Sequence, residues 1–142
     1  MCEKIVAPCG IDCFNCEMYK DNITPDFQER ISARMGVPKE KITCNGCKDG
    51  SMCLLLDIRG LKCKTLECVK TKGVDYCFQC NDFPCKFLMP VADNALKVPH
   101  NMKVYNLCTI KRIGLEAFCE KAADIRKTYF GKQFGIGEGG SK

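Results

Sequence analysis

Cysteine is the residue type whose number and spacing point most directly to chemistry in this sequence. Fourteen of the 142 residues are cysteines. The segment from Cys44 to Cys85 holds eight of them and contains two C-x2-C pairs, Cys44/Cys47 and Cys77/Cys80. Two residues between thiolates let both sulfurs bind one tetrahedral ion from a single tight turn. The spacing therefore indicates bound metal.

A group of three cysteines precedes this segment. Residues 9–16 read CGIDCFNC, which gives Cys9-x3-Cys13-x2-Cys16. Radical S-adenosylmethionine enzymes hold a [4Fe–4S] cluster with this spacing, but they need most of a βα barrel, which takes roughly 200 residues or more. The present chain is shorter and shows no alternation of strands and helices. We therefore expect metal ligation here without radical chemistry, with one ligand supplied from elsewhere in the chain.

Further cysteines lie at looser spacings. Cys63-x4-Cys68 sits between the two C-x2-C pairs, and this position favours ligation. The ligand that completes the N-terminal group of three could be Cys85, one of Cys63 or Cys68, or the less favoured His100. We choose Cys85, because closing a long loop removes the most entropy from the unfolded chain. Cys53 abuts the apolar run Leu54–Leu56. It is explained equally well as a buried thiol or as a ligand, so its role stays open.

The predicted ligands are ten thiols. They are Cys9, Cys13, Cys16, Cys44, Cys47, Cys63, Cys68, Cys77, Cys80 and Cys85. Ten thiols fill two four-thiolate sites with two to spare, so we expect about two Zn²⁺ per chain. The alternative is an iron–sulfur redox or electron-transfer protein with a [4Fe–4S] cluster on the same cysteines. The cysteines around Cys80 lack the x2, x2, x3 spacing of the ferredoxins, which favours zinc.

Composition bears on the compartment. The first residues, MCEKIVAPCG, contain no apolar run typical of a signal peptide, and no segment has the length of a membrane span. We therefore expect a cytoplasmic protein with reduced thiols and no membrane partner. A secreted scaffold held by disulfides is the less favoured interpretation.

The charge argues against a nucleic-acid partner. The formal net charge is +5 with neutral thiols. Eight thiolates and two Zn²⁺ would add eight negative and four positive charges, which lowers the net charge to about +1. Residues 1–86 carry 13 Lys and Arg against 12 Asp and Glu, while residues 87–142 carry 9 against 5. A neutral metal-binding half is a poor electrostatic footprint for binding phosphates.

Few other residues suggest chemistry. His100 is the only histidine, and we interpret it as a loop or capping residue rather than as a ligand or a general base. No second histidine is present to share a motif with a carboxylate, so no nucleophilic triad can be assembled and we do not expect an enzyme. Cys108 and Cys119 fall on apolar stripes of predicted helices. We expect both in the core and not at a metal.

A short amphipathic helix is predicted between Thr24 and Gly36. Thr24 suits the N-cap, and Gly36 suits the position after the last turn. Phe27, Ile31 and Met35 recur on one face, which we expect to pack in the core.

Three helices are predicted in the C-terminal half. The first covers residues 84–96 and is kinked by Pro90. The second begins after Asn101 as its N-cap, and the third carries an apolar stripe over residues 115–129. The last residues, 135–142, read GIGEGGSK and are expected to form a flexible tail.

Several stretches together resemble a known family. CGIDCFNCEMY, CNGC, KCKTLECVKTKGVDYCFQCNDFPCKFL and PHNMKVYNLCTIKRIGLEAF are similar to the bacterial and archaeal cysteine-rich family called domain of unknown function 3795. The resemblance runs from about Cys9 to Tyr129, and its most specific parts are CGxDCxxC and CxxCxxxPC. It implies a compact cytoplasmic protein with a metal-binding front half, and it implies no reaction. The family pattern maps onto the ten predicted ligands, whereas Cys53 fits it less clearly.

The expected architecture is a single, mostly α domain over residues 1–142. An irregular cysteine-rich half, residues 1–86, is organised by metal-binding C-x2-C turns (zinc knuckles) and packs on a C-terminal three-helix segment, residues 87–134. Ordering a backbone costs about 1–2 kcal/mol per residue, whereas a structural zinc site contributes about 10–16 kcal/mol. We therefore expect a zinc-binding protein whose metal is mainly structural and which presents a surface to a protein or small-molecule partner.

Overall fold

The computed structural model describes residues 4–48, 51–94 and 97–131, and these ranges are mostly helical. The α-helices are α1 (Pro25–Met35), α2 (Leu54–Ile58), α3 (Lys64–Lys72), α4 (Lys103–Ile113) and α5 (Leu115–Gly131). The 3₁₀-helices are η1 (Cys13–Asn15), η2 (Lys39–Lys41), η3 (Cys77–Gln79), η4 (Lys86–Leu88), η5 (Ala92–Asn94) and η6 (Pro99–Met102). These residues form no strand, although one isolated parallel bridge pairs Tyr19 with Cys44. The predicted mostly α class is confirmed.

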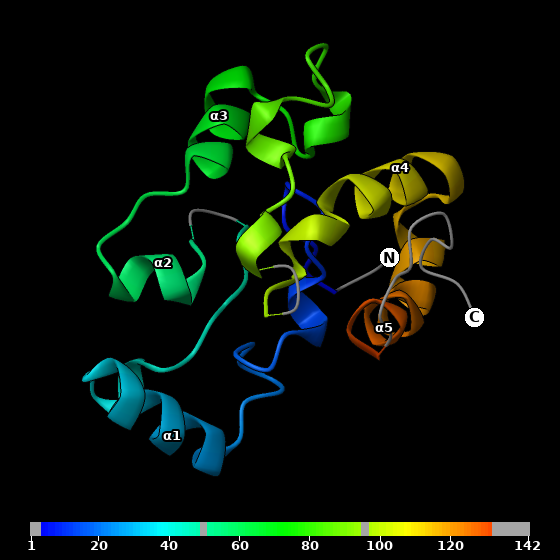
Figure 1. The fold of residues 1–142 in the computed structure, drawn as a ribbon. Coiled ribbons are helices and arrows are strands. Elements are labelled where there is room, and N and C mark those ends of the chain that lie inside the picture. Colours follow the sequence, from blue (N-terminus) through cyan, green and yellow to red (C-terminus); the bar gives the residue numbers. More distant parts are fainter. Residues whose placement is uncertain (1–3, 49–50, 95–96, 132–142) are drawn as a thin grey trace.

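The N-terminal segment, residues 4–12, runs through the middle of the molecule (Figure 1). Helices α4 and α5 pack against each other on one side of it, and α3 lies on the other side. Helix α1 lies at the far end of the molecule, where it packs on η2. The N-terminal segment is therefore placed to touch both the C-terminal helices and the cysteine-rich region.

Two clusters of buried side chains form the core. The first core cluster consists of Val6, Ile110, Phe118, Cys119 and Ala122. The second core cluster consists of Leu66, Val69, Cys77, Leu88 and Leu107. Helix α4 contributes Ile110 to the first cluster and Leu107 to the second, one turn apart on the same face. Helix α4 therefore joins the N-terminal segment and α5 to α3 and the later cysteines.

The helix predicted over residues 84–96 is wrong for the described residues 84–94, and residues 95–96 lie outside the described ranges. Residues Lys86–Leu88 and Ala92–Asn94 form 3₁₀ turns instead. Pro90 has no N–H to donate and disfavours helical backbone at the residue before it. Met89 is accordingly extended, with φ −60° and ψ 145°. Proline stops the helical backbone here and does not merely kink it, so α4 and α5 are the C-terminal helices that form.

The start of α4 also differs from the prediction. Asn101 lies inside η6, and α4 begins at Lys103. The side-chain oxygen of Asn101 accepts a hydrogen bond from the backbone N–H of Val91 at 2.7 Å. Asn101 therefore ties the preceding loop to α4 and does not cap the helix.

Helix α1 has the predicted ends but not the predicted environment. Thr24 Oγ1 accepts a hydrogen bond from the N–H of Phe27 at 3.2 Å, and Gly36 adopts the left-handed conformation with φ 66°. No residue of α1 is buried, so the expected core stripe is wrong. Its apolar face is only half-covered because α1 packs on the short η2 segment at the edge of the molecule.

No helix within the described ranges is both long and apolar enough to cross a membrane. The predicted tail, residues 135–142, lies outside the described residues.

Candidate metal centre

Two short turns share one sequence pattern and one backbone geometry. The first Cys turn, Cys13–Cys16, reads CFNC, and the second Cys turn, Cys77–Cys80, reads CFQC. In each turn the N–H of the last cysteine donates to the carbonyl oxygen of the first, at 2.9 Å and 3.1 Å respectively. The last cysteine is extended in both, with φ/ψ of −76°/136° and −78°/139°. The chain thus presents the same thiol pair twice.

Both turns are fixed to the N-terminal segment by backbone hydrogen bonds. The N–H of Phe14 donates to the carbonyl oxygen of Ile5 at 3.2 Å, and the N–H of Cys77 donates to that of Pro8 at 2.9 Å. Phe14 and Phe78, the second residue of each turn, pack against the first core cluster. The N-terminal segment therefore holds the two thiol pairs relative to each other.

Three thiols meet beside the first Cys turn. The Cys47 thiol lies close enough to the thiols of Cys13 and Cys53 to perturb their titration. This proximity lowers the pKa of Cys53 to about 6 and also lowers the pKa of Cys13, while the pKa of Cys47 is raised. Three thiols from separate parts of the chain thus lie near one another.

Two more thiols adjoin these three. Cys16 lies close enough to Cys13 and Cys44 for the charges of their thiolates to raise its pKa. The parallel bridge between Tyr19 and Cys44 brings the second segment to the first Cys turn, and the N–H of Cys44 donates to the carbonyl oxygen of Met18 at 3.0 Å. We call these thiols the first thiol group. It consists of Cys13, Cys16, Cys44, Cys47 and Cys53.

Gly46 allows the segment that carries Cys47 to lie against the first Cys turn. Its φ of 86° is a conformation that residues with a side chain rarely adopt. A Cβ at this position would lie 2.7 Å from Ile5 Cγ2 and 3.5 Å from Cys13 Cβ. Any side chain here would push the neighbouring Cys47 away from the first Cys turn.

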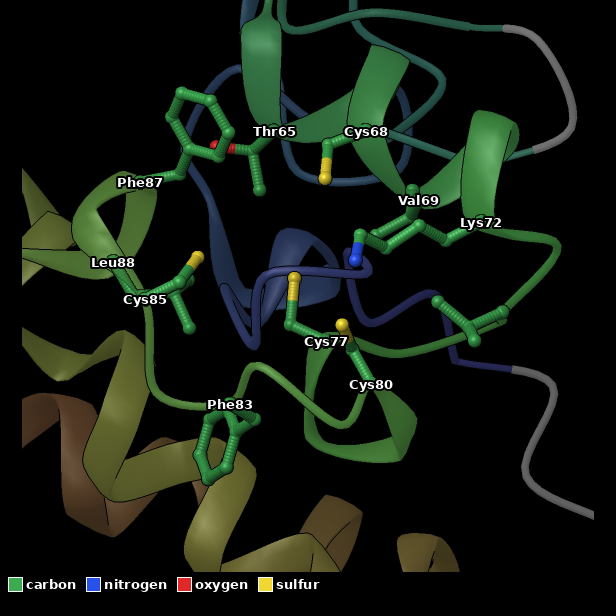
Figure 2. A pocket seen from close by; sticks show the side chains of 11 residues that line it. Thr65, Cys68, Val69, Lys72, Cys77, Cys80, Phe83, Cys85, Phe87 and Leu88 are labelled. Atoms are coloured by element: carbon green, nitrogen blue, oxygen red, sulfur yellow. The ribbon is translucent and has the colours of Figure 1, made fainter.

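The second thiol group lines a cavity between α3 and the second Cys turn (Figure 2). Its members are Cys68 of α3, Cys77 and Cys80 of the turn, and Cys85. Figure 2 shows their sulfurs directed toward one shared space, from α3 on one side and from the turn on the other. The cavity encloses about 330 Å³, including the open space at its mouth. The remaining walls include Val69, Val74, Phe83, Phe87 and Leu88.

Polar groups surround Cys80 at the mouth of this cavity. The Lys72 ammonium group lies 2.5 Å from the Asp82 carboxylate. The backbone N–H of Asp82 donates to Cys80 Sγ at 3.4 Å. Lys72, Cys80 and Asp82 therefore form one polar cluster.

The same local backbone arrangement recurs at other cysteines. Burial raises the pKa of Cys9 and of Cys16, but at these two cysteines and at Cys53 the amide two residues further along the chain acts to lower the pKa. The Asp82 amide donates to Cys80 Sγ from the same relative position. Such amides orient sulfur ligands in metal sites and stabilise their charge. The backbone therefore suits these positions to anionic sulfur.

Cys9 and Cys63 lie between the two thiol groups. Both pack against the second core cluster. Cys9 is within electrostatic reach of Cys13 and Cys63, and Cys77 is within reach of Cys9. Burial raises the pKa of Cys9 to about 11 and that of Cys77 to about 12. The positive charge of Lys103 opposes this effect at both thiols but does not outweigh burial.

A buried ion pair fixes the first Cys turn to α5. Arg126 Nη1 donates to Asp12 Oδ1 at 2.6 Å, and the Asp12 side chain is fully buried. Asn15 Nδ2 donates to the other carboxylate oxygen of Asp12 at 2.9 Å. The residue before Cys13 is therefore held by a helix from the far end of the sequence.

The structure divides the predicted ligands differently from the sequence analysis in one respect. Cys85 is predicted to complete the N-terminal group of Cys9, Cys13 and Cys16, yet it lines the cavity of the second thiol group. Cys13 instead contacts Cys47. The entropy of loop closure favours any partner that is distant in the sequence. It therefore could not distinguish Cys85 from Cys47 as the partner of the N-terminal cysteines.

Two cysteines have roles that the sequence left open or misplaced. Cys53 joins the first thiol group through Cys47. The available signal was its position directly before the short helix α2, whose first amides face the sulfur. Cys108 is exposed, contrary to prediction, because it lies off the face of α4 that carries Leu107 and Ile110. Cys119 is buried, as predicted.

No disulfide joins cysteines within the described ranges. As the side chains stand, no three His, Cys, Asp or Glu residues in ranges 4–48, 51–94 and 97–131 form a group that could hold a metal ion. Either thiol group would have to rotate its side chains to enclose an ion. The zinc-knuckle geometry expected from the sequence therefore stays a prediction.

Fold and site together define a class: a mostly α, cysteine-rich protein with a duplicated C-x2-C turn and two thiol groups. The chain belongs to the family described as protein of unknown function (DUF3795), which matches residues 5–90. This confirms the family that the sequence motifs suggested. The matched range contains all ten predicted ligands and Cys53, and it ends before α4. No curated protein and no solved structure matches the chain.

Proposed function

We propose that the protein binds two Zn²⁺ ions through two four-thiolate sites whose main role is to hold the cysteine-rich half together. The observation that carries the proposal is the gathering of thiols into two groups, each built on one Cys turn. The second site would use Cys68, Cys77, Cys80 and Cys85. The first would use Cys13, Cys47 and Cys53, with Cys16 or Cys44 as the fourth ligand. Closed sites of four thiolates are typical of structural zinc.

The compactness of the first thiol group supports a single small ion. Cys47 lies close to Cys13 and Cys53. A tetrahedral zinc ion with Zn–S bonds of about 2.3 Å holds its sulfurs about 3.8 Å apart. Zinc would therefore fit between neighbouring thiols, each of which would release its proton on binding. In a [4Fe–4S] cluster each thiolate binds a different iron, which keeps the sulfurs farther apart. Contact between thiols therefore favours zinc over the iron–sulfur alternative.

The sparse apolar burial of α1 and α2 supports a structural role for the metal. Helix α1 buries no residue and α2 buries only Leu54. Ordering each residue costs about 1–2 kcal/mol, and a structural zinc site contributes about 10–16 kcal/mol. Zinc would therefore offset the part of this conformational entropy cost that apolar burial does not offset.

The proposed sites imply a setting and a mode of action. Thiolates stay available for zinc where thiols are kept reduced, so we expect the protein in the cytoplasm. Closed four-thiolate sites leave no coordination position for a substrate. The assembled fold would then act by presenting a surface to a protein or small-molecule partner.

Elemental analysis of the protein purified without added metal tests this proposal. We expect a colourless protein with about two Zn²⁺ per chain. A brown protein that contains iron and absorbs near about 400 nm would establish the iron–sulfur alternative instead. Less than about half an equivalent of any transition metal would overturn metal binding altogether.

A further inference from the structure

Lys103 is a buried lysine without a carboxylate partner in the described ranges. It is the first residue of α4, and only 9% of its surface is exposed. Lys72 and Arg126, by contrast, are paired with the carboxylates of Asp82 and Asp12. Burying an ammonium group without a counter-charge is costly, so the position needs a compensating anion.

Lys103 packs against the loop that carries Cys9, the cysteine between the two thiol groups. Its charge acts most on Cys9 and more weakly on Cys53 of the first group and on Cys77 of the second. Helix α4 reaches this point because residue 10 is glycine: a Cβ on Gly10 would lie 2.7 Å from the carbonyl oxygen of Lys103. The packing of α4 on this loop therefore fixes Lys103 beside the thiols.

Two other cations near the thiols are already compensated. Lys72 is paired with Asp82, and Arg126 is paired with Asp12. Lys103 differs from both, because the sulfurs are the groups left to balance its charge.

We propose that Lys103 is the shared counter-cation of both zinc sites, a positioning residue that binds no metal itself. This inference rests on the proposed function. Four thiolates around one Zn²⁺ leave two negative charges uncompensated, and removing such charge from water is costly. An ammonium group between the sites lowers that cost for both, so one residue supports two metal ions.

The test compares Lys103→Met with Lys103→Arg in the full zinc-loaded chain, by titrating bound zinc against a chromophoric chelator. Methionine keeps the apolar stem and removes the charge, whereas arginine keeps the charge and adds bulk. We expect Lys103→Met to weaken zinc binding at both sites by about 10- to 100-fold, the usual cost of losing an outer-shell partner. Lys103→Arg should retain most of the parent affinity. Lys111→Met, at an exposed position of the same helix, should bind like the parent.

Comparing the zinc affinities of the two variants separates a role of the charge from a role in packing. If Lys103 acted only through packing, arginine would be tolerated less well than methionine. Lower affinity in Lys103→Arg than in Lys103→Met would therefore overturn the inference. The inference would also be overturned if Lys103→Met bound zinc with unchanged affinity, or if it lost zinc affinity at one site alone. In either case the proposed function would stand. A parent chain that takes up no zinc overturns both. If circular dichroism shows that Lys103→Met does not fold, Lys103→Gln replaces it with the same expected loss.

Discussion

His100 is a half-buried imidazole in η6, just before α4. Its Nδ1 atom is buried and has no hydrogen-bond partner among the described residues. Burial, with a smaller contribution from the charge of Lys103, lowers the pKa of His100 to about 4. The ring is therefore neutral near pH 7, and the folded protein resists protonating it.

Replacing His100 with glutamine should reduce the loss of stability in mild acid. The unfolded chain takes up the proton near pH 6.5 and the folded chain near pH 4. Between these values the unfolded chain binds more protons, so the contribution of the neutral ring is present above pH 6.5 and is lost as the pH falls to 4. Urea denaturation from pH 7 to pH 4 should show the parent losing stability relative to His100→Gln. Acid loss of zinc affects both chains alike and cancels in this difference. A difference that stays constant over the whole range would contradict the buried neutral ring.

Among the secondary-structure elements, those defined by local signals could be predicted and those defined by distant contacts could not. Thr24 and Gly36 fix the ends of α1 through atoms a few residues away, so the sequence sufficed there. The C-x2-C spacing coincides with a turn at Cys13–Cys16 and at Cys77–Cys80, but not at Cys44–Cys47, where Cys44 lies in the bridge to Tyr19. The grouping of the turns with other cysteines depends on hydrogen bonds to Ile5 and Pro8 and on the bridge at Cys44. No periodicity in the sequence encodes those contacts.

Residues 84–96 show how a real periodicity can mislead. Phe87, Leu88 and Val91 recur at helical spacing, and Leu88 is indeed buried in the second core cluster. Leu88 reaches the core from a single 3₁₀ turn, because Pro90 prevents the helix from continuing. The burial of this position was predictable, whereas the backbone that achieves it was not.

The division into two thiol groups predicts separate effects of cysteine variants. Cys53→Ser and Cys85→Ser should each remove one zinc equivalent, because a site that loses one of four thiolates loses most of its binding free energy. Hydrogen exchange should then locate the damage: near Cys13 in the first variant, and in α3 and the second Cys turn in the other. Zinc analysis and exchange of the same samples give both readouts.

A buried cysteine outside both groups provides the control for these variants. Cys119→Ala should cost only about 0.5–3 kcal/mol of stability and leave both zinc ions bound. Faster exchange around residues 9–19 in Cys85→Ser would show instead that the N-terminal cysteines share a metal with Cys85, as the sequence analysis proposed.

Across the whole molecule, the Asp12–Arg126 ion pair joins residues 114 positions apart. Asp12 is fully buried and the Arg126 side chain is 17% exposed. The pair connects the first Cys turn to α5, which lies outside the range that matches the family. The cysteine-rich half and the C-terminal helices are therefore linked through a buried charge as well as through the core.

Arg126→Met should lower the free energy of unfolding by about 3–5 kcal/mol, because removing one partner leaves the other charge buried and uncompensated. Chemical denaturation of the zinc-loaded protein measures this loss. Lys127→Met, at the exposed neighbouring position, should leave stability unchanged. Adding Asp12→Asn to Arg126→Met should recover part of the loss by removing the buried charge. Equal stability of Arg126→Met and the parent would mean that the pair contributes nothing.

The separation of Asp12 and Arg126 in the chain also sets an order of events during synthesis. At about 5–20 residues per second, a ribosome reaches Arg126 roughly 6 to 23 seconds after Asp12. Every cysteine from Cys9 to Cys85 is translated before Arg126. The nascent chain must therefore carry these thiols for several seconds without α5 to cover the first Cys turn. During that interval they are open to metal ions and to oxidants alike.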